Sequence, residues 1–172
     1  IHANNIVFCE GASLKNNPYF NYIKLNPTKG ELLIIYCRSL NLDKIIHSKF
    51  LFIPLGNDYY SVGSTYNWSD VNNDFKTEEA RQKIKIMLDK TIKMKYKIID
   101  HYAGIRPSTF DRRALVGRHP VYRNMYILNG LGTRGVLLAP YLSNLLVKHI
   151  YLDKMLDLEI NVNRLINKKS PK

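Results

Sequence analysis

The sequence has 172 residues, of which 45% are hydrophobic, and its 26 lysines and arginines outnumber 14 acidic residues to give a net charge of +12. This composition excludes disordered and collagen-like chains and suffices for one hydrophobic core. No apolar run approaches the roughly 20 residues of a membrane span, and no secretion signal opens the sequence, so a cytoplasmic protein is expected. The charge is compatible with a nucleic-acid partner, although the lysines from Lys83 to Lys97 fall mostly on the polar face of a predicted helix.

The cysteines and histidines give no sign of a metal site. Cys9 and Cys37 lie in apolar, strand-like runs without C-x-x-C spacing, which predicts two buried, reduced thiols. The five histidines never fall at a ligand spacing, so no metal is expected.

The first half of the chain predicts a sheet followed by a helix. A buried strand is expected over residues 5–12, and β-rich runs follow at 31–37, 50–54 and 59–64, the last two joined by a hairpin turn. Together they predict an antiparallel sheet. From Thr77 to Ile92 the apolar residues recur at helical spacing, Thr77 can cap the helix, and two glutamates occupy its first turn.

The second half alternates strands, loops and a helix. Strands are predicted over residues 96–103 and 124–129, separated by a long arginine-rich connection over 107–120. A glycine-rich loop follows at 130–135, and an apolar helix is expected from Val136 to about Tyr151, with Pro140 in its first turn. A short strand at 158–162 and a lysine-rich tail close the sequence.

The loop from Gly130 to Gly135 fits the pattern G-x-G-x-x-G between a strand and a helix, which first suggests a dinucleotide-binding Rossmann site. Its context argues against that interpretation, because about 37 residues follow Gly135, too few for the remaining strands of such a domain. A more general expectation remains. Glycines let backbone amides approach a ligand, and the positive end of the next helix favours negative charge there.

Three elements together resemble the carboxyl-terminal signature of the D-amino-acid-oxidase-like family of FAD-dependent oxidoreductases, the glycine and sarcosine oxidase branch in particular. They are AGIRPST at 103–109, DRRALVGRHP at 111–120 and NGLGTRGVLLAP at 129–140. The order and spacing of the three are more specific than any one alone. Ala114 stands where the family has a proline, and the run FLFIP at 50–54 lacks the tyrosine that glycine-oxidase-like members place against the substrate.

The resemblance implies roles for individual residues. Arg106 resembles the arginine that forks onto the substrate carboxylate, and Arg134 and Leu51 are further candidates for substrate binding. The residues that resemble the flavin-binding positions are Gly11, Gly130, Gly132, Thr133, Arg134 and Gly135. No separate catalytic side chain is implied, because the flavin carries the chemistry. No cysteine lies near residues 106–117, where covalent-flavin members carry one, so noncovalent FAD is expected.

The resulting prediction is an α+β fold with a mostly antiparallel substrate-domain sheet, plus carboxyl-terminal pieces of an FAD-binding α/β domain whose amino-terminal Rossmann part is missing. The predicted divisions are residues 1–12 in the FAD-binding domain, 13–124 in the substrate domain, and 125–172 as a flavin-contacting loop, helix and tail. The apolar surfaces at Ile6–Phe8 and along the helix that follows Gly135 are expected to be exposed, because their partner is the remaining FAD-binding domain of the same protein.

The predicted function is oxidation of a C–N bond of an amine or amino acid within a longer chain, the present part being inactive alone. Two alternatives remain open. One is the oxidase domain of a tRNA wobble-uridine modification enzyme, and the other is a noncatalytic, basic nucleic-acid-binding module.

Overall fold

The computed structural model describes residues 2–166, and its internal contacts divide the chain into two compact units. Unit 1 joins Ile1–Pro27 to Arg106–Lys172, and unit 2 is the continuous stretch Thr28–Ile105. These bounds differ from the predicted divisions after residues 12 and 124. The reason is that Leu14 and Phe20, far along the sequence from Leu115 and Ile127, share one buried cluster with them.

Unit 1 is built on a small sheet with the strand order β1-β8-β7, in which β1 is parallel and β7 antiparallel to β8. Its elements are β1 (Ile6–Phe8), η1 (Gly11–Asn16), β7 (Leu115–Arg118), β8 (Met125–Asn129), η2 (Gly132–Arg134), α2 (Gly135–Leu152) and η3 (Val162–Leu165). The central position of β8 gives it a hydrogen-bonded neighbour along each edge.

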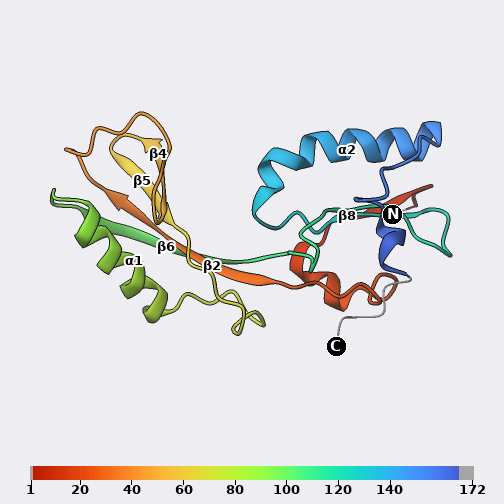
Figure 1. The fold of residues 1–172 in the computed structure, drawn as a ribbon, viewed down its shortest axis with the longest axis horizontal. Coiled ribbons are helices and arrows are strands. Elements are labelled where there is room, and N and C mark those ends of the chain that lie inside the picture. The colour runs from red at the N-terminus through yellow and green to blue at the C-terminus, as the bar shows by residue number, and fades with distance from the viewer. Residues whose placement is uncertain (1, 167–172) are drawn as a thin grey trace. The chain divides into compact units, whose positions relative to one another are not determined.

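Successive residues of β7 and β8 point to opposite faces of this sheet, as the pleat of a strand requires. Leu115 and Ile127 pack with Leu14, Phe20 and Val162 on one face. Their chain neighbours Val116 and Tyr126 pack with Leu142 and Leu146 of α2 on the other face. Figure 1 shows α2 running along one side of β8. The sheet is therefore enclosed between α2 and the short helical segments.

Unit 2 is a five-stranded sheet with the order β3-β4-β5-β2-β6 and one helix, which confirms the predicted antiparallel sheet with a helix. Its elements are β2 (Thr28–Tyr36), β3 (Ile46–His47), β4 (Leu51–Gly56), β5 (Tyr59–Gly63), α1 (Glu78–Thr91) and β6 (Lys97–Arg106, whose last residue belongs to unit 1).

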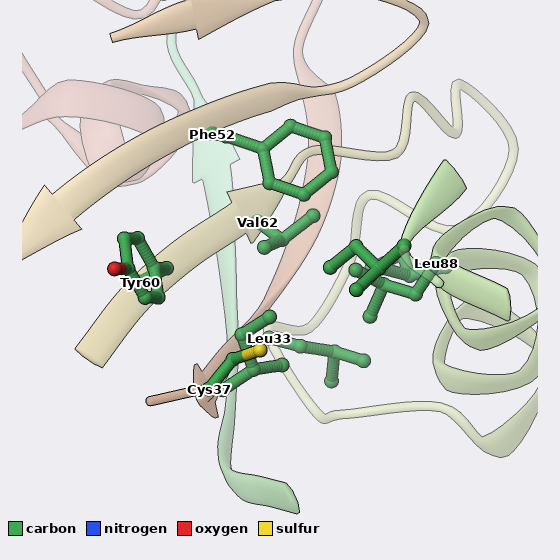
Figure 2. Packing of buried hydrophobic residues seen from close by; sticks show 9 residues of the cluster. Leu33, Cys37, Phe52, Tyr60, Val62 and Leu88 are labelled. Atoms are coloured by element: carbon green, nitrogen blue, oxygen red, sulfur yellow. The ribbon is translucent and has the colours of Figure 1, made fainter. Parts of the chain in front are cut away.

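Helix α1 covers one face of the unit 2 sheet. Its buried residues Ile84 and Leu88 pack against Leu33 of β2 and Val62 of β5, and Figure 2 shows Leu33, Val62 and Leu88 in this cluster. Thr77 caps α1 as predicted, since its hydroxyl accepts from the Ala80 amide at 3.2 Å. The same hydroxyl donates to Glu31 of β2 at 2.7 Å, which ties the start of the helix to the sheet.

Several local predictions were wrong. The arginine-rich connection contains the strand β7, and residues 158–162 form only an isolated bridge, Val116 to Asn161, before η3. Helix α2 already begins at Gly135, so Pro140 lies in its second turn. Cys37 is buried, but Cys9 is exposed, because the residues around it lie at the edge of the small sheet.

Apolar surface is exposed at the two places where the sequence predicted it, but the buried strand expected over residues 5–12 is only Ile6–Phe8 and is partly exposed. Ile6 and Val7 on the edge strand β1 are each 40% exposed, and Phe8 is half-buried. On α2, Val136 and Leu137 are 96% and 76% exposed, whereas Leu142 and Leu146 face the sheet. Within residues 2–166, neither helix has both the length and the apolar character that crossing a membrane requires.

Candidate functional site

The candidate flavin-binding glycines of unit 1 gather where two parallel strands end. Because β1 and β8 run parallel, Gly11 and Gly130, which follow them, lie at the same edge of the sheet. Ligands of α/β sheets bind at the carboxyl ends of parallel strands, where the chain turns toward a helix. Two glycines 119 positions apart in the numbering thus come to one place.

A buried asparagine at the end of β8 joins these two turns. The Asn129 side chain donates from Nδ2 to the Gly11 carbonyl at 3.0 Å, and its Oδ1 accepts from the Gly130 amide at 2.8 Å. Sequence analysis did not single out Asn129. Its only signal was a polar residue at the end of an apolar strand, where a buried amide must find partners.

The glycine loop, residues 130–135, requires glycine at two positions for reasons of space and backbone conformation. Gly130 has φ +71°, and a Cβ there would lie 2.9 Å from Thr109 Cγ2. Gly132 has φ +54°, and its Cβ would lie 3.1 Å from Ser108 Oγ. Both φ values fall where side chains are disfavoured. The loop therefore packs directly onto the residues that follow Arg106.

We call residues 107–113 the supporting turn. The Gly132 amide donates to the Pro107 carbonyl at 3.3 Å, and the Arg134 guanidinium donates to the Arg112 carbonyl. Arg106 is the last residue of β6, immediately before this turn. Arg106 and the glycine loop are thus neighbours within unit 1, because the loop is hydrogen-bonded to the backbone of the turn that directly follows Arg106.

The remaining loop residues lead into α2. Thr133 and Arg134 are exposed, and Gly135 is the first residue of the helix. The start of α2 has no side-chain cap and no acidic residue in its first turn. Neither a capping side chain nor an acid of its own first turn therefore offsets its positive end, which favours negative charge nearby.

Leu51 belongs to unit 2, whereas the glycine turns described above belong to unit 1. It is the first residue of β4 and is paired in register with Gly63 of β5, which is itself opposite Leu32 of β2. A Cβ on Gly63 would lie 2.6 Å from Leu32 Cβ, so the strands approach closely at this row. Leu51 is half-buried on the sheet.

An ion pair holds the far end of the supporting turn. The Arg164 guanidinium contacts both oxygens of Asp111, from Nε at 2.9 Å and from Nη2 at 3.1 Å. Burial alone would raise the pKa of the Asp111 carboxyl, yet the hydrogen bonds from Arg164 and the Arg113 amide lower it from 3.8 to about 2. Asp111 is therefore ionised at neutral pH, and Arg164 is a second residue that sequence analysis did not identify.

The model of the FAD-dependent oxidoreductase family matches residues 1–149. The chain belongs to this family. Glycine oxidase of Bacillus subtilis is 30% identical over 149 residues, covering 81% of this chain and 39% of the relative. The tRNA 5-methylaminomethyl-2-thiouridine biosynthesis bifunctional protein MnmC of Campylobacter jejuni is 26% identical over 115 residues, covering 65% of this chain and 18% of the relative.

Among solved structures, glycine oxidase from Geobacillus kaustophilus superposes with a TM-score of 0.75 at 21% identity, covering 92% of this chain and 44% of that one. This likeness shows a shared fold. The chain thus spans less than half the length of each of these relatives. The glycine turn at the end of β8, where Gly130 and Gly132 leave no room for side chains and α2 begins without a side-chain cap, fits the close approach of a flavin.

Proposed function

We propose that the protein oxidises the C–N bond of an amine or amino acid, using noncovalently bound FAD. The observation that carries this proposal is the packing of the glycine loop on the turn that begins after Arg106, through the hydrogen bond from Gly132 to Pro107. In this arrangement one loop can hold the cofactor while the preceding arginine holds the substrate. Membership of the FAD-dependent oxidoreductase family supports the reaction class.

The cofactor is held by the glycine-rich turns. Gly11, Gly130 and Gly132 give the flavin close access to backbone, and Thr133, Arg134 and Gly135 lead the loop into α2. Bound FAD supplies the hydride acceptor for the carbon beside the amine nitrogen. The uncapped start of α2 stabilises negative charge that develops next to it. Arg134 holds the glycine loop on the supporting turn, because its guanidinium donates to the Arg112 carbonyl.

The substrate is held by its carboxylate. The Arg106 guanidinium is planar and permanently charged, which suits a two-point contact with a carboxylate. Leu51 offers the substrate apolar surface from β4, whose sequence lacks the tyrosine that glycine-oxidase-like members place against the substrate. The name of the Bacillus subtilis relative, glycine oxidase, supports an amino-acid substrate for this protein as well.

The test uses the full-length protein under anaerobic conditions. We expect a flavin absorbance spectrum that bleaches with at least one member of a panel of glycine, sarcosine and iminodiacetate, and more slowly with methylamine, which lacks a carboxylate. Acid precipitation should release the flavin into the supernatant. Protein that takes up no FAD on reconstitution contradicts the proposal, and flavin that remains on the precipitate contradicts the noncovalent attachment.

A second candidate is oxidation of an amine carried by tRNA, as the name of the Campylobacter jejuni relative suggests. The observation that favours it is a groove of about 930 Å³ in unit 2 with five cationic side chains along it: Arg38, Arg81, Lys85, Lys95 and Lys97. Asp89 is the one acid that lines this groove, and Lys85 already pairs with it at 2.7 Å. Tyr36 and Tyr96 add aromatic surface on which bases can stack.

This candidate predicts salt-sensitive RNA binding that depends on the groove. Replacing Arg81 and Lys85 by glutamine should weaken binding of a fluorescein-labelled tRNA roughly tenfold in an anisotropy titration, because two phosphate contacts are lost. Lys83 and Lys90 lie on the same helix and do not line the groove, so their double replacement by glutamine is the matched control. Equal weakening by both pairs, or no binding by the wild type, removes this candidate.

A further inference from the structure

The segment that follows α2 lies beyond the span of the family match, which ends at residue 149. It is nevertheless attached firmly to unit 1. Val162 is fully buried with Leu115 and Ile127, and the Val116 amide donates to the Ile160 carbonyl at 2.9 Å. These contacts fix η3 on β7, so the side chains of η3 have defined positions.

From this fixed base, Arg164 reaches the supporting turn at several points. Besides its two contacts with Asp111, its guanidinium donates from Nη2 to the Arg113 carbonyl at 3.1 Å and from Nη1 to the Asn161 carbonyl at 3.1 Å. The Arg164 side chain is only 10% exposed, and the fork onto Asp111 is partly shielded from solvent. An arginine fork of this kind sets the orientation of its partner as well as its distance.

The supporting turn connects Arg164 to the glycine loop. Asp111 Oδ1 accepts from the Arg113 amide at 3.1 Å, and the Thr109 hydroxyl donates to the Arg113 carbonyl at 2.8 Å, which closes the turn on itself. Thr109 is in turn the residue that a Cβ on Gly130 would meet. Contacts therefore run without a gap from η3 through Asp111 and Thr109 to the loop.

We propose that Arg164 is a positioning residue, which holds the supporting turn and so the glycine loop in the conformation that binds FAD. This inference rests on the proposed flavin site. It assigns to the segment after α2 a role in cofactor affinity. The role is exerted through Asp111, and Arg164 itself does not contact the cofactor.

The experiment compares Arg164→Met and Arg164→Lys in the full-length protein with the matched control Arg118→Met. Arg118 also pairs with an aspartate, Asp153 at 3.1 Å, but Asp153 and its other hydrogen-bond partner, Tyr126, lie outside the supporting turn and the glycine loop. Titration of the flavin-free protein with FAD gives the dissociation constant. Hydrogen exchange of peptides spanning residues 130–135 reports the loop without any cofactor.

For Arg164→Met we expect a dissociation constant for FAD raised about tenfold or more, a changed visible spectrum of the bound flavin, and faster exchange across the glycine loop. Lysine keeps one charged contact, so Arg164→Lys should recover part of the loss. Arg118→Met should match the wild type in all three. Because buried contacts hold η3 independently, unfolding by urea should still be cooperative.

The outcomes are distinct. If wild-type protein takes up no FAD, the proposed function fails, and the exchange measurement still decides whether Arg164 positions the loop. If wild type binds FAD and Arg164→Met binds it equally well with unchanged exchange, the positioning role is overturned and the proposed function stands. Equal effects of Arg164→Met and Arg118→Met also overturn it, because they indicate a general loss of stability.

Discussion

Arg106→Lys should lower kcat/KM for a carboxylate-bearing amine about ten- to a hundredfold, while the flavin content of the protein stays at the wild-type level. Lysine keeps the positive charge but loses the planar fork, so a two-point contact with the carboxylate becomes a single contact. The loss of one charge-assisted hydrogen bond, about 1.5 to 3 kcal/mol, gives this range. Flavin bleaching under anaerobic conditions measures the rate, and absorbance per protein measures the cofactor.

The control for this experiment is Arg123→Lys, a conservative change at an exposed arginine in the turn before β8. It should leave both readouts unchanged. Equal bleaching rates of Arg106→Lys and wild type with every carboxylate-bearing substrate would remove Arg106 from the substrate site. Loss of flavin with an unchanged rate per bound flavin would instead assign Arg106 to the cofactor.

Gly130→Ala should destabilise the protein by about 2 to 5 kcal/mol and abolish flavin binding. Alanine at the observed φ of +71° carries a backbone penalty of about 1 to 2 kcal/mol. Its Cβ would also meet Thr109 Cγ2 at 2.9 Å and Leu115 Cγ at 3.0 Å, and overpacking of this kind costs about 1 to 3 kcal/mol more. Urea unfolding measures the stability, and absorbance measures the bound flavin.

Gly56→Ala separates the backbone penalty at positive φ from the cost of overpacking. Gly56 has φ +88°, but a Cβ there would meet nothing within 4 Å, so only the backbone penalty of about 1 to 2 kcal/mol applies. Flavin binding should survive in this variant. A Gly130→Ala protein with wild-type stability would show that Thr109 and Leu115 can move aside, which is incompatible with a tightly packed loop.

Local sequence patterns were sufficient for the elements that depend on neighbouring residues. The helix α1 could be predicted because Thr77 caps it and because Ile84 and Leu88 recur on one face, so its start and buried side were both encoded within 16 residues. The glycine loop could be placed because strand, glycines and helix follow one another directly. Glycine is the residue that most readily adopts a positive φ, and Gly130 and Gly132 both do so.

Features that depend on distant parts of the chain could not be predicted this way. Strand β7 was hidden because it is four residues long, contains Gly117 at φ +134° and follows a polar turn. The roles of Asn129 and Arg164 arise only when their partners Gly11 and Asp111 are brought close, 118 and 53 residues away. Of the predicted site residues, Leu51 belongs to the other unit, so nothing in unit 1 tests its role.

The parallel pairing of β1 with β8 also constrains how the protein is synthesised. Unit 2 is one continuous stretch and can complete its contacts once residue 105 has left the ribosome, whereas β1 must wait for a partner whose last residue is Asn129. At about 5 to 20 residues per second, this wait lasts roughly 6 to 24 s. Throughout it the apolar residues Ile6, Val7 and Phe8 lack β8, the strand that pairs with them within residues 2–166. Unit 2 can therefore bury its core during synthesis, whereas the apolar residues of β1 stay without their partner β8 for longer and depend more on protection by a chaperone.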